Sequence, residues 1–152
     1  MSNKVFNFKT QMAVGDKGES EFCLYYPELE PLKSKEKSVD FILKDGRIVE
    51  VKTESRCMNT TPNFFMETMS HGKIGGPWRA KQDGVDDFVV YFIQNKTFFW
   101  FEPITLCDRL EFLITTKKFK LKTIWNPNWT AEGYAIPRSE LEDVTLKQDV
   151  FI

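Results

Sequence analysis

Residues 38–53 decide the fold, and they read Ser-Val-Asp-Phe-Ile-Leu-Lys-Asp-Gly-Arg-Ile-Val-Glu-Val-Lys-Thr. Two runs rich in β-branched and aromatic residues, 38–43 and 47–53, flank the turn residues Lys44-Asp45-Gly46. Such runs on both sides of an Asp-Gly pair are typical of a β-hairpin. The sequence therefore predicts two antiparallel strands joined by a tight turn.

Glu50 and Lys52 share one face of the second strand, because side chains alternate along a strand, and the two valines beside them face the other way. The position of Asp40 depends on the turn. A two-residue turn directs Asp40 away from Glu50. A three-residue turn, with Gly46 in the left-handed bulge position, places the two carboxylates opposite each other, with Cβ atoms about 4.5–5.5 Å apart. We predict the three-residue turn, because a joint function requires it.

Two carboxylates at that separation repel each other unless a cation lies between them. Mg²⁺ takes oxygen ligands and suits one or two carboxylates with water and phosphate. Asp40 and Glu50 are therefore candidate ligands for Mg²⁺, with Mn²⁺ as a substitute. Lys52 could hold the attacking water or stabilise the charge of a pentavalent transition state. The alternative interpretation is an exposed hairpin face that simply carries charges.

A first helix containing Gly18-Glu19, then Val39-Asp40-Phe41, then Val49 to Thr53 make a pattern that resembles the PD-(D/E)XK nuclease superfamily. The spacing is most similar to its small resolvase-like and phage or homing-type members. The resemblance implies an α/β (α+β) fold, a restriction-endonuclease-like mixed β-sheet flanked by helices, and metal-dependent hydrolysis of DNA. It makes Asp40, Glu50 and the carbonyl of Val51 metal ligands, Lys52 the catalytic lysine, and a glutamate of the first helix a further catalytic acid.

Either Glu19 or Glu21 is that helical acid, since the two lie about 200° apart on a helix and only one can face the site. We favour Glu19, which follows Gly18 and shares a face with Phe22. The alternative is that both are solvated glutamates, favoured near the start of a helix by its dipole.

The remaining pattern predicts one domain over residues 1–152. We expect helices over 12–27, 78–82 and 104–114 and further strands over 63–68, 87–93, 97–101, 117–124 and 131–137, with a loop over 28–37. Such an order of elements is typical of an α/β or α+β domain around a mixed sheet.

A formal net charge of −1 excludes a uniformly basic nucleic-acid-binding surface, so DNA contacts must be local. The glycine-rich segment 72–77 lacks the spacing of a phosphate-binding P-loop, but residues around it could contact DNA: His71, Lys73, Arg79 and Lys81. Glu67 could add a carboxylate near the metal. Lys118, Lys120 and Lys122 could follow DNA or protect an edge strand from aggregation.

The three cysteines, Cys23, Cys57 and Cys107, form no CxxC pair, and the sequence has no apolar stretch long enough for a membrane span. We expect reduced thiols, no membrane partner and a location in the cytoplasm of a bacterial or phage-infected cell.

Together these features predict a magnesium-dependent endodeoxyribonuclease that acts on double-stranded or branched DNA, in site-specific (homing or restriction type) cleavage or Holliday-junction resolution. Duplex cleavage needs two active sites, so we expect a homodimer or a larger symmetric oligomer. The alternatives are a catalytically inactive DNA-binding or protein-interaction module of the same fold, and cleavage of RNA in place of DNA.

Overall fold

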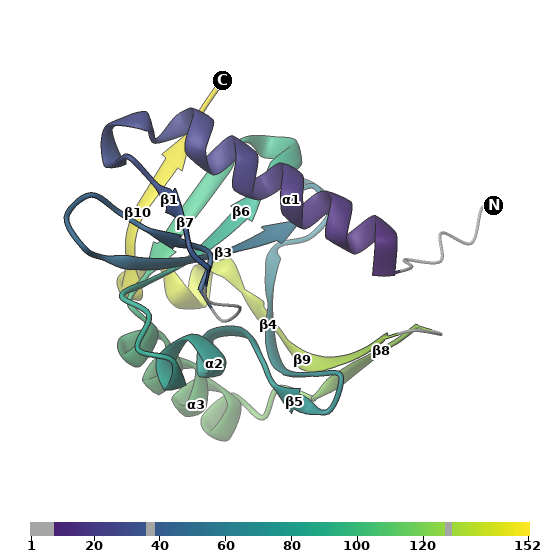
Figure 1. Cartoon of the computed structure of the whole chain (residues 1–152). Coiled ribbons are helices and arrows are strands. Elements are labelled where there is room, and N and C mark those ends of the chain that lie inside the picture. Colours follow the sequence, from purple (N-terminus) through teal and green to yellow (C-terminus); the bar gives the residue numbers. More distant parts are fainter. Residues whose placement is uncertain (1–7, 36–38, 127–128) are drawn as a thin grey trace.

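Two β-sheets organise the chain in the computed structural model, which describes residues 8–35, 39–126 and 129–152 (Figure 1). The first sheet has six strands, in the spatial order β1 (Leu32–Lys33), β2 (Phe41–Ile42), β3 (Ile48–Glu54), β6 (Asp87–Phe92), β7 (Thr97–Phe101) and β10 (Thr145–Val150). The second has four, in the order β5 (Lys73–Ile74), β4 (Asn63–Ser70), β9 (Trp129–Pro137) and β8 (Lys122–Asn126). Strands β3 and β6 run parallel and the other pairs antiparallel, so the first sheet is mixed.

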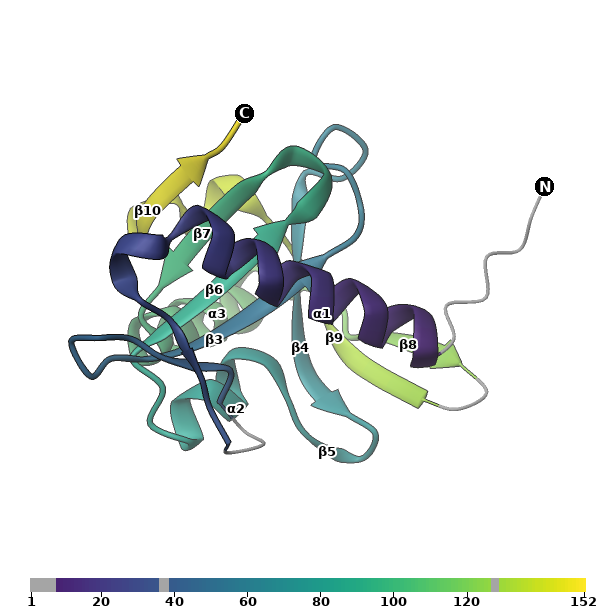
Figure 2. The same cartoon turned by 45° about the horizontal axis from the view of Figure 1, so that its top comes forward.

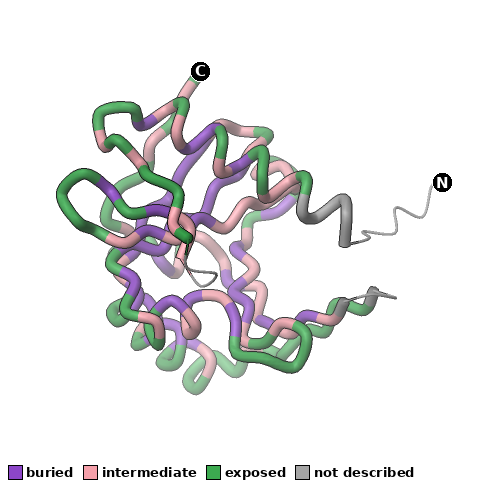
Figure 3. The backbone as a smooth tube through the Cα atoms, viewed as in Figure 1, coloured by how far each residue is buried: buried purple, intermediate pink, exposed green. Residues whose placement is uncertain are grey.

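Helices cover both faces of the six-stranded sheet, and the mixed α/β fold class is confirmed. The helices are α1 (Phe8–Tyr25), α2 (Gly76–Gln82) and α3 (Pro103–Lys117), with 3-10 turns at Pro27–Leu29, Ile93–Asn95 and Arg138–Val144. Helix α1 lies over one face of this sheet (Figure 2), where Phe22 of the helix and Tyr26, just beyond its end, pack with Val49 and Val51. Helices α2 and α3 and the four-stranded sheet cover the opposite side, and buried residues concentrate in the strands between these layers (Figure 3).

The hairpin at residues 41–49 has the predicted three-residue turn. Phe41 pairs with Val49 and Ile42 with Ile48, the Leu43 N–H donates to the Arg47 carbonyl at 2.9 Å, and Gly46 has φ +89°. Continuing this register by one residue places Asp40 opposite Glu50. Since side chains of directly opposed residues share a face of the sheet, the two carboxylates lie on the same side.

Two predictions of secondary structure were wrong, and one strand was not predicted. Helix α3 continues to Lys117 and ends at Lys118, which has φ +53°, so β8 begins only at Lys122 and the row of three lysines does not share one strand. The predicted loop 28–37 contains β1, and β10, which follows residue 137, was not predicted. Both are edge strands with mostly exposed side chains, so neither shows the apolar alternation by which strands are recognised.

Gly18 allows α1 to lie closely against β3. It is buried, and a Cβ atom there would lie 1.8 Å from Thr53 Oγ1. We expect Gly18→Ala to lower the free energy of unfolding by about 1–3 kcal/mol, because overpacking forces the helix away from the sheet. Urea denaturation measures the effect.

Gly15→Ala is the matched control, since it lies in the same helix and its added Cβ meets nothing within 4 Å. Its better helix propensity should leave stability unchanged or raise it by up to about 1 kcal/mol. Equal losses in both variants would contradict the packing explanation.

Candidate active site

The candidate site lies at the edge of β3 where its neighbour β2 starts. Only two residues of β2 pair with β3, so the Val51 N–H has no backbone partner in β2 and donates to Asp40 Oδ2 at 2.7 Å. The N–H and C=O of one strand residue project to the same side. The Val51 carbonyl therefore lies at the same edge of the sheet as the Asp40 carboxylate.

The surroundings of Asp40 oppose ionisation of its carboxyl group. Burial raises the pKa of Asp40 to about 6, and repulsion from Glu19 and a side-chain hydrogen bond between the two carboxyl groups add to the effect. The hydrogen bond from the Val51 N–H and the nearby Lys33 act in the opposite direction but do not outweigh burial. A positive charge beside Asp40 would reverse this shift.

The pKa of Glu50 is raised further above its ordinary value than that of Asp40. Burial, followed by repulsion from Asp40, raises its pKa to about 8, although Arg79 and Lys52 partly counteract these effects. Its Oε2 atom is buried and has no hydrogen-bond partner among the residues that the structure describes. An uncompensated buried carboxylate oxygen is costly, and a cation is the partner that would satisfy it.

The chemistry of these ligands fits a divalent cation that keeps water in its coordination shell. Within the described ranges, no three His, Cys, Asp or Glu side chains converge into a group able to hold a metal by themselves. Mg²⁺ does not require such a group, since one or two carboxylates suffice when water and phosphate complete its shell. Asp40, Glu50 and the Val51 carbonyl supply that smaller set.

The two helical glutamates occupy different environments. Glu19 lies beside Asp40 and pairs with Lys33 at 3.5 Å. Glu21 is buried away from the site and accepts from Tyr91 Oη at 2.5 Å and from Lys96 Nζ at 2.6 Å. Burial raises the pKa of Glu21, but these hydrogen bonds outweigh it and lower the pKa overall. Of the two, Glu19 is the acid that the structure brings next to Asp40.

Lys52 projects from the same face of β3 as Glu50 and is half-exposed. Its Nζ lies 3.4 Å from Glu67 Oε2, on strand β4 of the other sheet. Glu67 itself is 8% exposed. The contact therefore joins the two sheets at the site, with a titratable side chain from each.

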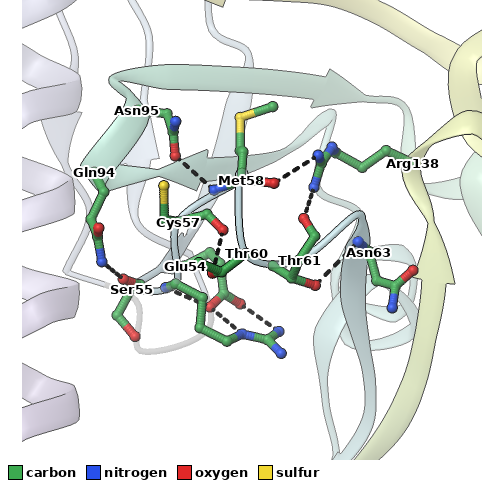
Figure 4. A network of polar contacts seen from close by, with 11 residues as sticks. Glu54, Ser55, Cys57, Met58, Thr60, Thr61, Asn63, Gln94, Asn95 and Arg138 are labelled. Carbon is green, nitrogen blue, oxygen red and sulfur yellow. Dashed lines mark hydrogen bonds and ion pairs between the residues drawn. The ribbon is translucent and has the colours of Figure 1, made fainter.

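The loop between β3 and β4 keeps these two strands in place. Figure 4 shows three side chains from elsewhere in the fold that bind its backbone: Gln94, Asn95 and Arg138. The bonds run from Gln94 to the Ser55 carbonyl (2.5 Å), from the Met58 N–H to Asn95 (2.8 Å), and from Arg138 to the carbonyls of Thr61 (2.6 Å) and Met58 (3.3 Å). The loop is thus anchored at several points, which limits movement of Lys52 relative to Glu67.

Of the four predicted DNA-contact residues, the structure brings only Arg79 close to a carboxylate of the site. Arg79, on α2, is close enough to Glu50 to lower its pKa, and it also pairs with Asp83 at 3.1 Å. Lys81 is exposed on the same helix, whereas His71 and Lys73 are exposed at the turn between β4 and β5. Within the described part of the chain, no hydrogen bond or ion pair joins these last three to Asp40 or Glu50.

Two charged residues near the site were not expected from the sequence. Lys33 reaches Glu19 from β1, and Asp83 at the end of α2 raises the pKa of Glu50. Neither position carries a usable signal in the sequence, because Lys33 lies in a segment without apolar periodicity and Asp83 follows a short helix. Both are brought to the site by long-range contacts.

No family model, no curated protein and no solved structure matches this chain. The described residues also include no helix that is both long and apolar enough to span a membrane. The functional interpretation therefore depends on the site itself.

Proposed function

We propose that this chain is a magnesium-dependent endodeoxyribonuclease of the PD-(D/E)XK type, with Asp40, Glu50 and Lys52 at its active site. One observation supports the proposal most. Two opposed carboxylates with raised pKa values lie beside a lysine, and Oε2 of Glu50 is buried without a partner among the described residues. A purely structural face of a hairpin has no reason to bury such a repulsive pair.

Asp40, Glu50 and the carbonyl of Val51 are the groups that would hold Mg²⁺ or Mn²⁺. A divalent ion bound there supplies Lewis-acid activation of the scissile phosphate and a water of lowered pKa. Lys52 donates from Nζ to the attacking water or to a phosphate oxygen that gains charge in the transition state. Glu19 adds negative charge beside Asp40, which raises the pKa of that carboxyl and would also strengthen its attraction for a divalent cation.

Local contacts hold the DNA in this proposal, in keeping with a net charge of −1. Arg79 and Lys81 on α2, with Lys73 and His71 near β5, supply contacts to phosphate. Cutting both strands of a duplex needs two such sites, so we propose a homodimer or a larger symmetric oligomer. Site-specific cleavage and junction resolution both remain within this proposal, and the preferred substrate distinguishes them.

Cleavage of supercoiled plasmid and of a four-way junction tests the proposal. We expect the wild type to cut one of them with Mg²⁺ and neither with EDTA, and Asp40→Asn to be inactive because it removes a ligand charge. DNA binding without cleavage at any metal concentration, together with no heat of Mg²⁺ binding in calorimetry, would instead identify an inactive DNA-binding module. Cleavage of RNA alone would change the substrate class.

A further inference from the structure

The stability of the fold does not account for a glutamate at position 67. Its carboxylate is buried in the middle of β4, and its only described ion pair is the 3.4 Å contact with Lys52. The partner in that pair is half-exposed, so the attraction is weak compared with the cost of burying a carboxylate. A methionine or leucine of similar volume would fill the space at a lower cost.

The backbone around Glu67 is nevertheless built to accommodate this side chain. The register between β4 and β9 shifts between Glu67 and Met69, which marks a β-bulge. Bulges redirect the side chains beside them. On the neighbouring strand β9, Gly133 lies opposite Glu67, and a Cβ there would be 2.8 Å from Glu67 Cα. The nearest atom to that Cβ would be the Met66 carbonyl oxygen, at 2.6 Å, so Gly133 lets the two backbones approach closely at the bulge that directs Glu67.

Two consecutive glycines pack against Glu67, Gly75 against its carboxylate and Gly76 against its backbone. A Cβ at Gly75 would lie 2.6 Å from Glu67 Oε1, and a Cβ at Gly76 would lie 2.2 Å from the Glu67 carbonyl oxygen. The Gly75 N–H also donates to the Thr68 carbonyl at 3.0 Å, which ties this segment to β4. The Glu67 carboxylate is therefore held with Oε1 against Gly75 and Oε2 toward Lys52.

We propose that Glu67 is a positioning residue for Lys52, and that Gly75 acts on Lys52 through Glu67 by leaving space for its carboxylate. This inference rests on the proposed catalytic role of Lys52. Glu67 accepts from one of the three N–H bonds of the ammonium, which restricts the rotamers of a long side chain and leaves the other two N–H bonds for water and phosphate. In this arrangement the second sheet contributes to the site without touching the substrate.

The first test measures the order of the Lys52 side chain by ¹³C relaxation NMR at Cε, without DNA or metal. In Glu67→Gln, which keeps the shape of the side chain, we expect a lower order parameter at Lys52. We also expect the single-turnover cleavage rate at saturating DNA to fall about 10-fold with DNA affinity unchanged, less than the roughly 10²–10⁴-fold contribution of a group that itself transfers a proton, because Glu67 acts only through Lys52. Glu67→Asp should recover part of the rate.

Gly75 provides the sharper test, because its φ of −136° is open to any residue and only the contact with Glu67 opposes a side chain. Gly75→Ala should lower both the order at Lys52 and the cleavage rate. In a Glu67→Ala background the contact is gone, so adding Gly75→Ala should change neither quantity further. Gly15→Ala, whose added Cβ meets nothing, is the control.

Two results would overturn the positioning role. The first is an unchanged order parameter of Lys52 in folded Glu67→Gln, and the second is a Gly75→Ala effect that persists after Glu67 is removed. If Glu67→Ala does not fold, the order parameter of Lys52 in Glu67→Gln, compared with that in the wild type, decides whether Glu67 positions Lys52. A wild type that cuts no DNA would defeat the proposed nuclease function, whereas the NMR result would still decide whether Glu67 orders Lys52.

Discussion

Glu50→Gln is expected to unfold at a higher temperature than the wild type at pH 8 in the absence of divalent metal, although it removes a proposed metal ligand. The pKa of Glu50 is raised from 4.5 to about 8 in the fold, so the folded state opposes the charged form. One pKa unit corresponds to about 1.4 kcal/mol. We expect a gain of about 2–4 kcal/mol, or about 5–10 °C, because a neutral amide avoids the buried charge.

The sign of the pH dependence follows from the direction of the shift. Glu50 contributes no penalty below pH 4.5, where it is protonated in both states. Stability of the metal-free wild type is lost as the pH rises from 4.5 through about 8, since the unfolded chain then releases a proton that the folded chain retains. Asp40, raised from 3.8 to about 6, adds a loss in the lower part of this range.

Thermal melting from pH 5 to 9, with EDTA and with Mg²⁺, measures this effect. We expect Mg²⁺ to restore the stability of the wild type most strongly near pH 8, because ligand carboxylates must be deprotonated before metal binds. Glu50→Gln should lose that response. Glu142→Gln, at an exposed site, is the control. A wild-type melting temperature that is independent of pH over this range would contradict the proposed charge state of Glu50.

Lys52→Ala is expected to lower the rate of Mg²⁺-dependent cleavage by a factor of about 10²–10³, the usual loss when one electrostatic stabiliser of a transition state is removed. The affinity for DNA should change little, because a single half-exposed lysine adds little to phosphate binding. Metal binding by Asp40 and Glu50 should also persist. Single-turnover kinetics, combined with calorimetric titration of Mg²⁺, separates these effects.

The matched control is Lys44→Ala, in the turn of the same hairpin. Lys44 is exposed and forms only a long surface ion pair with Glu30, at 3.8 Å. Such pairs contribute little. Equal losses of activity in the two variants would mean that Lys52 acts through the net charge of the hairpin. Full activity of Lys52→Ala would show that Lys52 has no catalytic role.

The hairpin that carries Asp40 and Glu50 could be predicted because it is local, but its turn length was chosen on functional grounds, and the structure confirms that choice. Gly46 favours the left-handed conformation of the bulge, and the alternation of charged and apolar residues on β3 determines which side chains face the core. Both features depend on residues close in the sequence. The same is true of β6 and β7, which were both predicted, because nine of their eleven residues are apolar.

The sequence by itself determined the strands of the two hairpins, the main helices and the shared face of Glu50 and Lys52, because short-range periodicity and turn residues specify them. Only the tertiary structure decided that Glu19 lies beside Asp40, that Glu67 meets Lys52, and that β10 completes the first sheet. These contacts join residues far apart in the chain. Their formation depends on how helices and sheets pack, and local patterns do not encode it.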